Sequence, residues 1–208
     1  NRGLAETFTT HNTNAFIQLR SSVDLEGSNE LAKKNIFNGL RKSNPGIGLN
    51  VNDRYRTTYY NTNDRGFKGP PGIISVHVRN RSTNGAVREA TIKMVAGSMA
   101  DIEDLDRLFF RPGHSLLLEW GHNHYHKDNS FRTAGTDMTV PDDEFFNPNT
   151  IGNIENRIEN LRENHQGNYD GMLGFIVNFS WGAREDGNFD ITINAYSKGA
   201  IMNYLKVS

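Results

Sequence analysis

The chain has 208 residues, with 23 basic and 24 acidic side chains, a net charge of −1 and no cysteine. Its balanced charge leaves no electrostatic footprint for nucleic acid or an anionic membrane surface. The absence of cysteine excludes disulfides and thiolate metal sites, and no apolar run approaches the roughly 20 residues of a membrane-spanning helix. Many glycines and only 36% hydrophobic residues indicate a loop-rich, mainly β protein that shares surface with neighbours.

The first fifth of the chain predicts an arm, a strand and a short helix. Residues 1–15 are polar and aperiodic, which is typical of a terminal arm. Apolar and polar residues alternate over 16–23, as in a strand with one buried face. A short helix is predicted over 28–40, where Ser28 can act as its cap. We group these elements as an N-terminal unit, residues 1–43.

The stretch 44–68 is predicted to be a long interface loop. Loops of this length in compact domains usually have a function or lack order. Cationic and aromatic residues are interspersed within it: Arg54, Tyr55, Arg56, Tyr59 and Tyr60. Tyrosine and arginine are enriched at interface hot spots, so these five are interface candidates. A nucleic-acid site, in which the aromatic rings stack on bases, is the alternative, and the neutral net charge disfavours it. A solvated hairpin with no binding role is the third possibility.

Residues 73–95 predict a β-hairpin. Apolar residues alternate on both sides of the Asn84-Gly85 pair, which favours the type I′ turn of a hairpin. The residues expected on the buried side are Ile74, Val76, Val78, Ala90, Ile92 and Met94.

A helix is predicted near 99–110, followed by a strand over 115–120. Ser98 and Asp101 have the spacing of a capping box, and Pro112-Gly113 ends the helix. Its apolar positions recur at helical spacing, and its acidic residues are expected to face solvent. The acids are Asp101, Glu103, Asp104 and Asp106.

Glu119 is an acid inside an apolar strand and next to Trp120. A general acid with a raised pKa is one interpretation. We favour pairing with an arginine across the sheet or across a subunit boundary, and Glu119 is therefore a further interface candidate.

His122, His124 and His126 occur at every second position, and on a strand they would share a face. Neutral imidazole is a common ligand of zinc, copper and nickel. The composition of 123–148 predicts a loop insertion, however, and no HExxH helix accompanies the histidines. We therefore expect surface histidines, with the three as weak metal candidates.

No catalytic signature is present: the sequence lacks GxSxG, Walker A and a GxGxxG following a strand. We expect no enzyme activity, no catalytic residue and no cofactor.

The C-terminal part predicts a helix near 150–164 and a second hairpin. The helix has a narrow apolar stripe and Asn149 or Thr150 as its cap. One strand of the hairpin is expected to place five apolar residues on one face: Leu173, Phe175, Val177, Phe179 and Trp181. The return strand adds Phe189, Ile191, Ile193 and Ala195, and the other face of both strands is polar.

The predicted fold class is α+β, mainly β, with two or three flanking helices and long loops, and with 69–208 as the principal β-domain. One face of the sheet is expected to be apolar and covered by helix, and the other polar and open. Such a sheet can line an aqueous lumen when copies form a ring.

Four stretches resemble the baseplate hub and tail-tube-like structural proteins of tailed bacteriophages: residues 18–37, 70–96, 104–122 and 172–207. The resemblance implies a tail-tube-like antiparallel β-sandwich or barrel that forms a ring around the tail channel as a trimer or hexamer. It also implies a non-enzymatic virion component, assembled in the host cytoplasm without stable membrane association. Its partners would be copies of itself and neighbouring tube, baseplate or spike proteins, with phage DNA only in transit.

A hub carries two such domains, and the second is expected to lie outside this chain. The alternative function is a small metal-assisted hydrolase or a carbohydrate-binding β-protein that uses His122–His126, with Glu119 as a further candidate.

Overall fold

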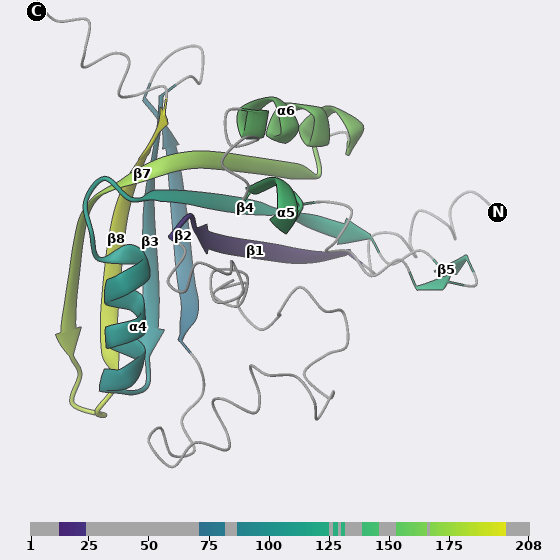
Figure 1. Cartoon of the computed structure of the whole chain (residues 1–208). Coiled ribbons are helices and arrows are strands. Elements are labelled where there is room, and N and C mark those ends of the chain that lie inside the picture. Colours follow the sequence, from purple (N-terminus) through teal and green to yellow (C-terminus); the bar gives the residue numbers. More distant parts are fainter. Residues whose placement is uncertain are drawn as a thin grey trace, which may run out of the picture.

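The computed structural model describes residues 13–23, 71–81, 87–124, 127–128, 130–131, 139–145, 153–165 and 167–198. Most of the predicted arm, the helix over 28–40, the loop over 44–68 and the Asn84-Gly85 turn lie outside these residues. The last three residues of the predicted arm, 13–15, belong to the first strand, which therefore starts earlier than predicted. The described part is mainly β, as predicted (Figure 1). In chain order its elements are β1 (Thr13–Ser21), β2 (Gly72–Asn80), β3 (Arg88–Ala96), α4 (Met99–Phe109), β4 (Ser115–His124), β5 (Lys127–Asp128), β6 (Ser130–Phe131), α5 (Asp142–Phe145), α6 (Ile154–Asn164), β7 (Tyr169–Ala183) and β8 (Phe189–Ser197).

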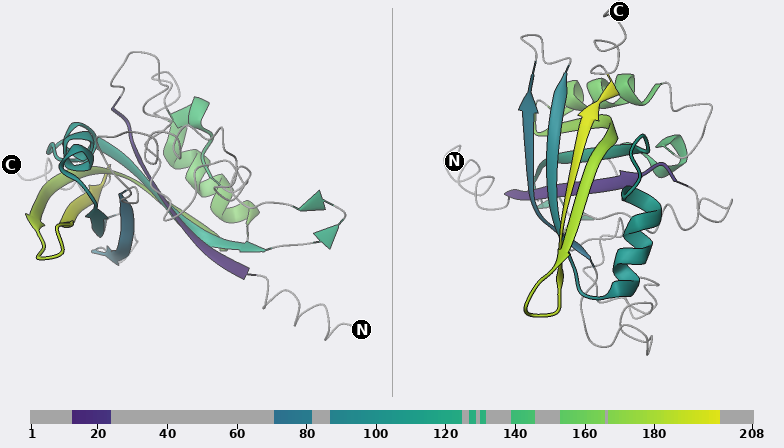
Figure 2. Two further views of the ribbon diagram at one scale, coloured as in Figure 1. Left: turned by 90° about the horizontal axis from the view of Figure 1, so that it is seen from below. Right: turned by 90° about the vertical axis from the view of Figure 1, so that its left-hand side faces the viewer.

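One curled sheet contains six strands in the order β1-β4-β7-β8-β3-β2, and all neighbours are antiparallel. β7 pairs with β4 in its first half and with β8 in its second half. The sheet therefore divides into two layers that cross at a steep angle (Figures 1 and 2). We call β1, β4 and the first half of β7 the three-stranded layer. The second half of β7 with β8, β3 and β2 is the four-stranded layer.

The two layers share very little backbone. Only Gly174 and Phe175 of β7 pair with a strand on both sides. A Cβ at position 174 would lie 2.6 Å from the carbonyl oxygen of Tyr196, so the crossing requires glycine here.

A β-bulge in β2 corrects one predicted face. Ile73 pairs with Met94 and Ser75 pairs with Lys93, so Ile74 has no cross-strand partner of its own. Ile73, Val76 and Val78 pack against the core, whereas Ile74 is 58% exposed. The prediction that Ile74 shares the buried side was wrong because the extra residue shifts the alternation.

A second bulge, at Val177 of β7, has the same effect on the C-terminal hairpin. Ile176 pairs with Ala195 and Asn178 with Asn194, which leaves Val177 as the extra residue. Leu173, before the bulge, joins the cluster beneath α6, whereas Phe179, after it, packs on the side of α4. The prediction of one shared face was therefore wrong for β7, while the buried face of β8 is as predicted.

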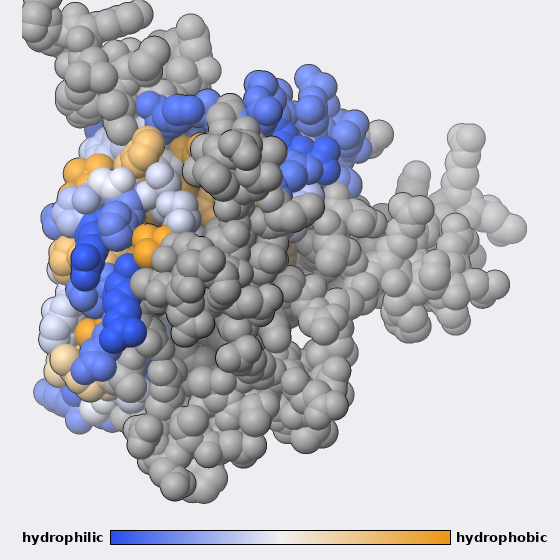
Figure 3. Space-filling view, viewed as in Figure 1, coloured by the Kyte–Doolittle hydropathy of each residue, from blue (hydrophilic) through white to orange (hydrophobic). Residues whose placement is uncertain are grey.

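α4 covers one side of the sheet, and its exposed side is hydrophilic (Figure 3). The Ser98 hydroxyl accepts a hydrogen bond from the Asp101 N–H at 3.3 Å and donates to Asp101 Oδ2 at 2.7 Å, so the predicted N-cap is confirmed. Asp101 itself is buried, contrary to the expectation that it faces solvent. The principal core beneath α4 includes Leu19, Ile92, Met94, Ile102, Leu105, Leu108, Phe109, Leu116, Leu118, Ile176, Ile191 and Ile193.

α6 covers the opposite face of the three-stranded layer. A second core there contains Leu117, Val140, Phe145, Ile154, Ile158, Leu161, Tyr169 and Leu173. The N-cap of α6 is Asn153, so the helix starts later than predicted. None of the helices in the described ranges is long and apolar enough to span a bilayer.

Candidate interaction surface

The four-stranded layer ends in two strand edges. β2 is the last strand of the sheet, and β4 pairs with β7 only as far as Phe175. The Val177–Ala183 segment of β7 therefore has a strand neighbour on one side only, within the described residues. The unpaired N–H and C=O groups of such edges are templates for pairing with another chain.

Both of these edges carry exposed apolar side chains. Four large hydrophobic residues are exposed in the part of the chain that the structure describes, and three lie on β2 or the second half of β7. Ile74 is 58% exposed, Val177 50% and Trp181 44%. Charged residues normally protect a free edge, whereas Ile74 on the β2 edge and Val177 and Trp181 on the β7 edge are exposed apolar residues. These three residues are the strongest contact candidates.

One face of the four-stranded layer is polar, as predicted, and no described element covers it. Cross-strand hydrogen bonds connect its side chains: Thr91 Oγ1 donates to Asn194 Oδ1 at 3.0 Å, and Tyr196 Oη to Glu89 Oε1 at 3.4 Å. Ten residues make up most of this face: Ser75, His77, Arg79, Glu89, Thr91, Lys93, Asn178, Ser180, Thr192 and Asn194.

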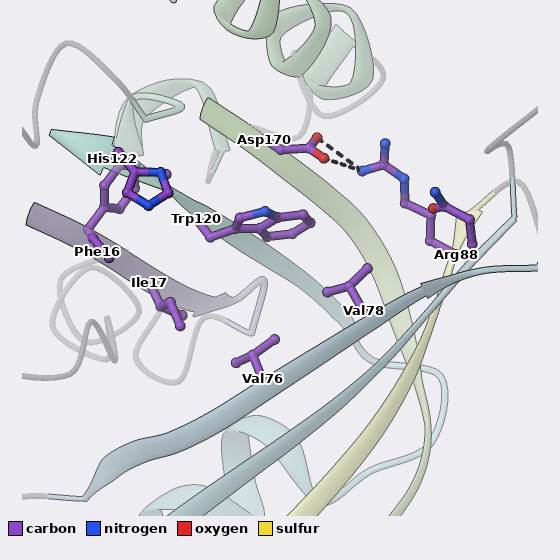
Figure 4. Close-up of a pocket in the computed structure, with 11 residues that line it drawn as sticks. Phe16, Ile17, Val76, Val78, Arg88, Trp120, His122 and Asp170 are labelled. Carbon is purple, nitrogen blue, oxygen red and sulfur yellow. Dashed lines mark hydrogen bonds and ion pairs between the residues drawn. The ribbon is translucent and has the colours of Figure 1, made fainter. Parts of the chain in front are cut away.

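A groove of about 430 Å³ lies on the other face, between β1 and β2. Figure 4 shows Trp120 in its middle, with His122 towards one end and Arg88 and Asp170 towards the other. Its apolar residues are Ala15, Phe16, Ile17, Val76, Val78 and Trp120. The groove exists because the sheet curls and brings its first and last strands together.

The charged end of the groove is a structural cluster. Arg88 Nη1 donates to the two Asp170 carboxylate oxygens at 3.0 and 3.1 Å, and Arg162 Nε donates to Oδ1 at 3.1 Å. Partial burial lowers the pKa of Arg162, but the hydrogen bond and negative charge of Asp170 outweigh it, so the pKa is raised overall. Asp170 thus connects β3, β7 and α6. Sequence reasoning missed this cluster, because Arg88 and Asp170 are 82 residues apart.

Glu119 lies on the opposite face, wholly buried, and pairs with the buried Arg20 of the neighbouring strand β1. Its Oε1 accepts hydrogen bonds from the Tyr169 hydroxyl and from the Val140 N–H, both at 2.8 Å. The Arg20 guanidinium lies 5.1 Å from the centre of the Phe145 ring. The predicted arginine partner across the sheet is therefore confirmed. The prediction of Glu119 as an interface residue was wrong, since its side chain has no exposed surface, and burial leaves no access for a substrate either.

Burial and the charge of Glu119 raise the pKa of the Tyr169 hydroxyl above its usual 10.0. The native state therefore holds this proton when the unfolded state releases it. Its contribution to stability is complete below pH 10 and falls as the pH rises further.

We expect the free energy of unfolding to fall by up to about 1.4 kcal/mol for each pH unit above 10 because of this single group. Tyr169→Phe should flatten the decline by that amount and cost about 1.5–3 kcal/mol at neutral pH, the value of a hydrogen bond to a charged group. Urea unfolding followed by circular dichroism between pH 8 and 11 measures both effects. Parallel declines in the two proteins would contradict the assignment.

His122 and His124 do not lie in a loop. β4 continues past the predicted strand end, so His122 and His124 belong to it, and the predicted insertion 123–148 also contains β5, β6 and α5. His122 is exposed and lines the groove. His126 lies outside the described residues, as do Arg54, Tyr55, Arg56, Tyr59 and Tyr60. Among the residues that are described, no three His, Cys, Asp or Glu side chains are grouped to hold a metal ion.

No protein-family model, curated protein or solved structure matches this chain.

Proposed function

We propose that the chain is a structural subunit of a bacteriophage tail, a baseplate hub or tube-like ring protein that surrounds the tail channel. It would join the tail tube to the spike or fibre and act in the virion after assembly in the host cytoplasm. The resemblance of its four sequence stretches to such proteins is one support. The principal observation is that exposed Ile74, Val177 and Trp181 lie on the two edges of a layer with one polar face.

The strand directions fit head-to-tail assembly. β2 and the second half of β7 are separated by three antiparallel pairings, so they run in opposite directions. When copies are related by rotation, β7 of one copy can meet β2 of the next as an antiparallel pair. Repeated contacts of this heterologous kind close into a ring if the rotation allows it.

The two faces of the layer suit the inside and the outside of such a ring. The uncovered polar face would line an aqueous channel, and the face beneath α4 would lie outward. Phage DNA would then pass polar side chains and side chains of both charges. Because this surface has no strong net charge, it would not retain the DNA during transit.

Negative-stain imaging of the purified chain, with sedimentation velocity, tests this proposal. We expect rings with an axial hole at concentrations where self-association is detected. Monomers at all concentrations, or closed two-fold dimers without a hole, would contradict it.

A further inference from the structure

The groove and Trp181 lie on the same side of the four-stranded layer, at opposite edges. Trp181 packs edge-on against Phe189, with ring centres 5.9 Å apart, and Phe189 contacts the core beneath α4. Val76 and Val78 of β2 contact the same core and line the groove. One edge therefore has an apolar groove, and the other has a large aromatic ring that the described residues leave partly exposed.

We propose that the groove is the socket for Trp181 of a second copy of this chain. The inference rests on the proposed function, since it takes ring assembly as given and names the contact that orders the subunits. If β7 of one copy pairs with β2 of the next copy, the two sheets form one continuous sheet. The face beneath α4 in one copy then continues into the face beneath α4 in the other, and the two polar faces are continuous in the same way. The indole of Trp181 then emerges on the side of Val76 and Val78, where the groove opens.

The groove suits an indole in its chemistry. Ile17, Val76, Val78 and Trp120 provide apolar walls, and burying an aromatic side chain is among the largest single contributions at interfaces. The indole N–H needs an acceptor when buried, and Asn80 offers an amide oxygen in the groove lining. We do not expect Asp170 to accept this hydrogen bond from the indole, because its carboxylate oxygens already accept hydrogen bonds from Arg88 and Arg162.

A second copy fits better than a small charged ligand. The opposite charges of Arg88 and Asp170 are paired with each other, so the groove has no uncompensated charge for an ionic group. Its length runs beside β2, whose edge offers backbone hydrogen bonds to a strand. A neighbouring β7 supplies both the strand and the aromatic side chain.

Site-directed cross-linking tests the contact directly, because the chain has no cysteine of its own. Val78→Cys places a thiol in the groove, and Ala183→Cys places one beside Trp181 on the same side of β7. The two variants are purified separately, mixed and treated with a short bifunctional thiol reagent. We expect a covalent dimer that contains one copy of each.

Ser180→Cys is the matched control, since Ser180 lies on the same edge but on the polar face. Mixed with Val78→Cys, it should give no covalent dimer. Equal yields of covalent dimer from the two mixtures, or no covalent dimer from either, would contradict the proposal that the groove binds Trp181. A small molecule or an unrelated peptide bound in the groove would contradict it as well.

Trp181→Ala gives the energetic test. Loss of a hot-spot tryptophan should weaken self-association about 30-fold, measured by sedimentation velocity, with unchanged circular dichroism. If rings persist with unchanged affinity and no specific cross-link, only the socket is wrong. If the unaltered chain never associates, the proposed function fails with it.

Discussion

Glu119→Leu is expected to lower the free energy of unfolding by about 3–5 kcal/mol, the usual cost of removing one partner of a buried ion pair. The substitution leaves the wholly buried guanidinium of Arg20 without its carboxylate. It also removes the acceptor of the Tyr169 hydroxyl and of the Val140 N–H. Urea unfolding monitored by circular dichroism measures the loss.

The double variant Arg20→Met with Glu119→Leu is the matched control. With both charges gone, no ion is left unpaired in the interior, so a large part of the lost stability should return. The return should be incomplete, because Tyr169 and Val140 still lack their acceptor. A loss below about 1 kcal/mol in the single variant would contradict a buried, dry ion pair.

Ile74→Lys combined with Val177→Lys is expected to convert the assembled protein to monomers. A lysine on a strand edge prevents sheet extension, because its charge must be desolvated when another strand approaches. Each residue is at least half exposed, so the fold should tolerate the change. Each single substitution should weaken self-association at least tenfold, the effect of about 1.4 kcal/mol, as measured by sedimentation velocity.

Met99→Lys serves as the control for this experiment. Met99 is the fourth exposed large hydrophobic residue in the described ranges, and it lies at the start of α4 instead of on either edge. Its substitution should leave self-association unchanged. An equal loss of assembly from Met99→Lys would show that general surface apolarity, and not the two edges, causes association.

Much of the fold is readable from the sequence because its local signals agree with the tertiary structure. The alternation of Ala90, Ile92 and Met94 predicts a strand, and the structure buries these three side chains. Ser98 and Asp101 predict where α4 starts. Such features depend on residues a few positions apart, which is the range over which sequence patterns carry information.

The errors arise where a long-range contact decides the outcome. Ile74 and Val177 look like regular members of an alternating strand, and only the pairing register makes them bulges. β4 extends to His124 because β1 offers Thr13 as a partner, although the local composition indicates a loop. The sequence predicts that Glu119 pairs with an arginine. It does not predict which arginine, because Arg20 is 99 residues away in the chain.

The candidate surface was only partly predictable for the same reason. The polar face follows from the alternation in 87–95 and 189–195. The groove cannot be predicted in this way, since its apolar walls come from β1, β2 and β4, its charged end from β3 and β7, and its shape depends on the curl of the whole sheet.

The narrow overlap at Gly174 and Phe175 has a mechanical consequence. Gly174 and Phe175 are the only residues of β7 that pair with both β4 and β8, so the backbone there joins the half of β7 that carries the free edge to the half that lies beneath α6. A force applied at the free edge of β7 would reach α6 through this short span, through the hydrophobic core beside it and through the ion pairs of Asp170 with Arg88 and Arg162. If copies of the chain are joined at this edge, as we propose, a small rotation between the two layers would change the angle between neighbouring copies without breaking the contacts that join them.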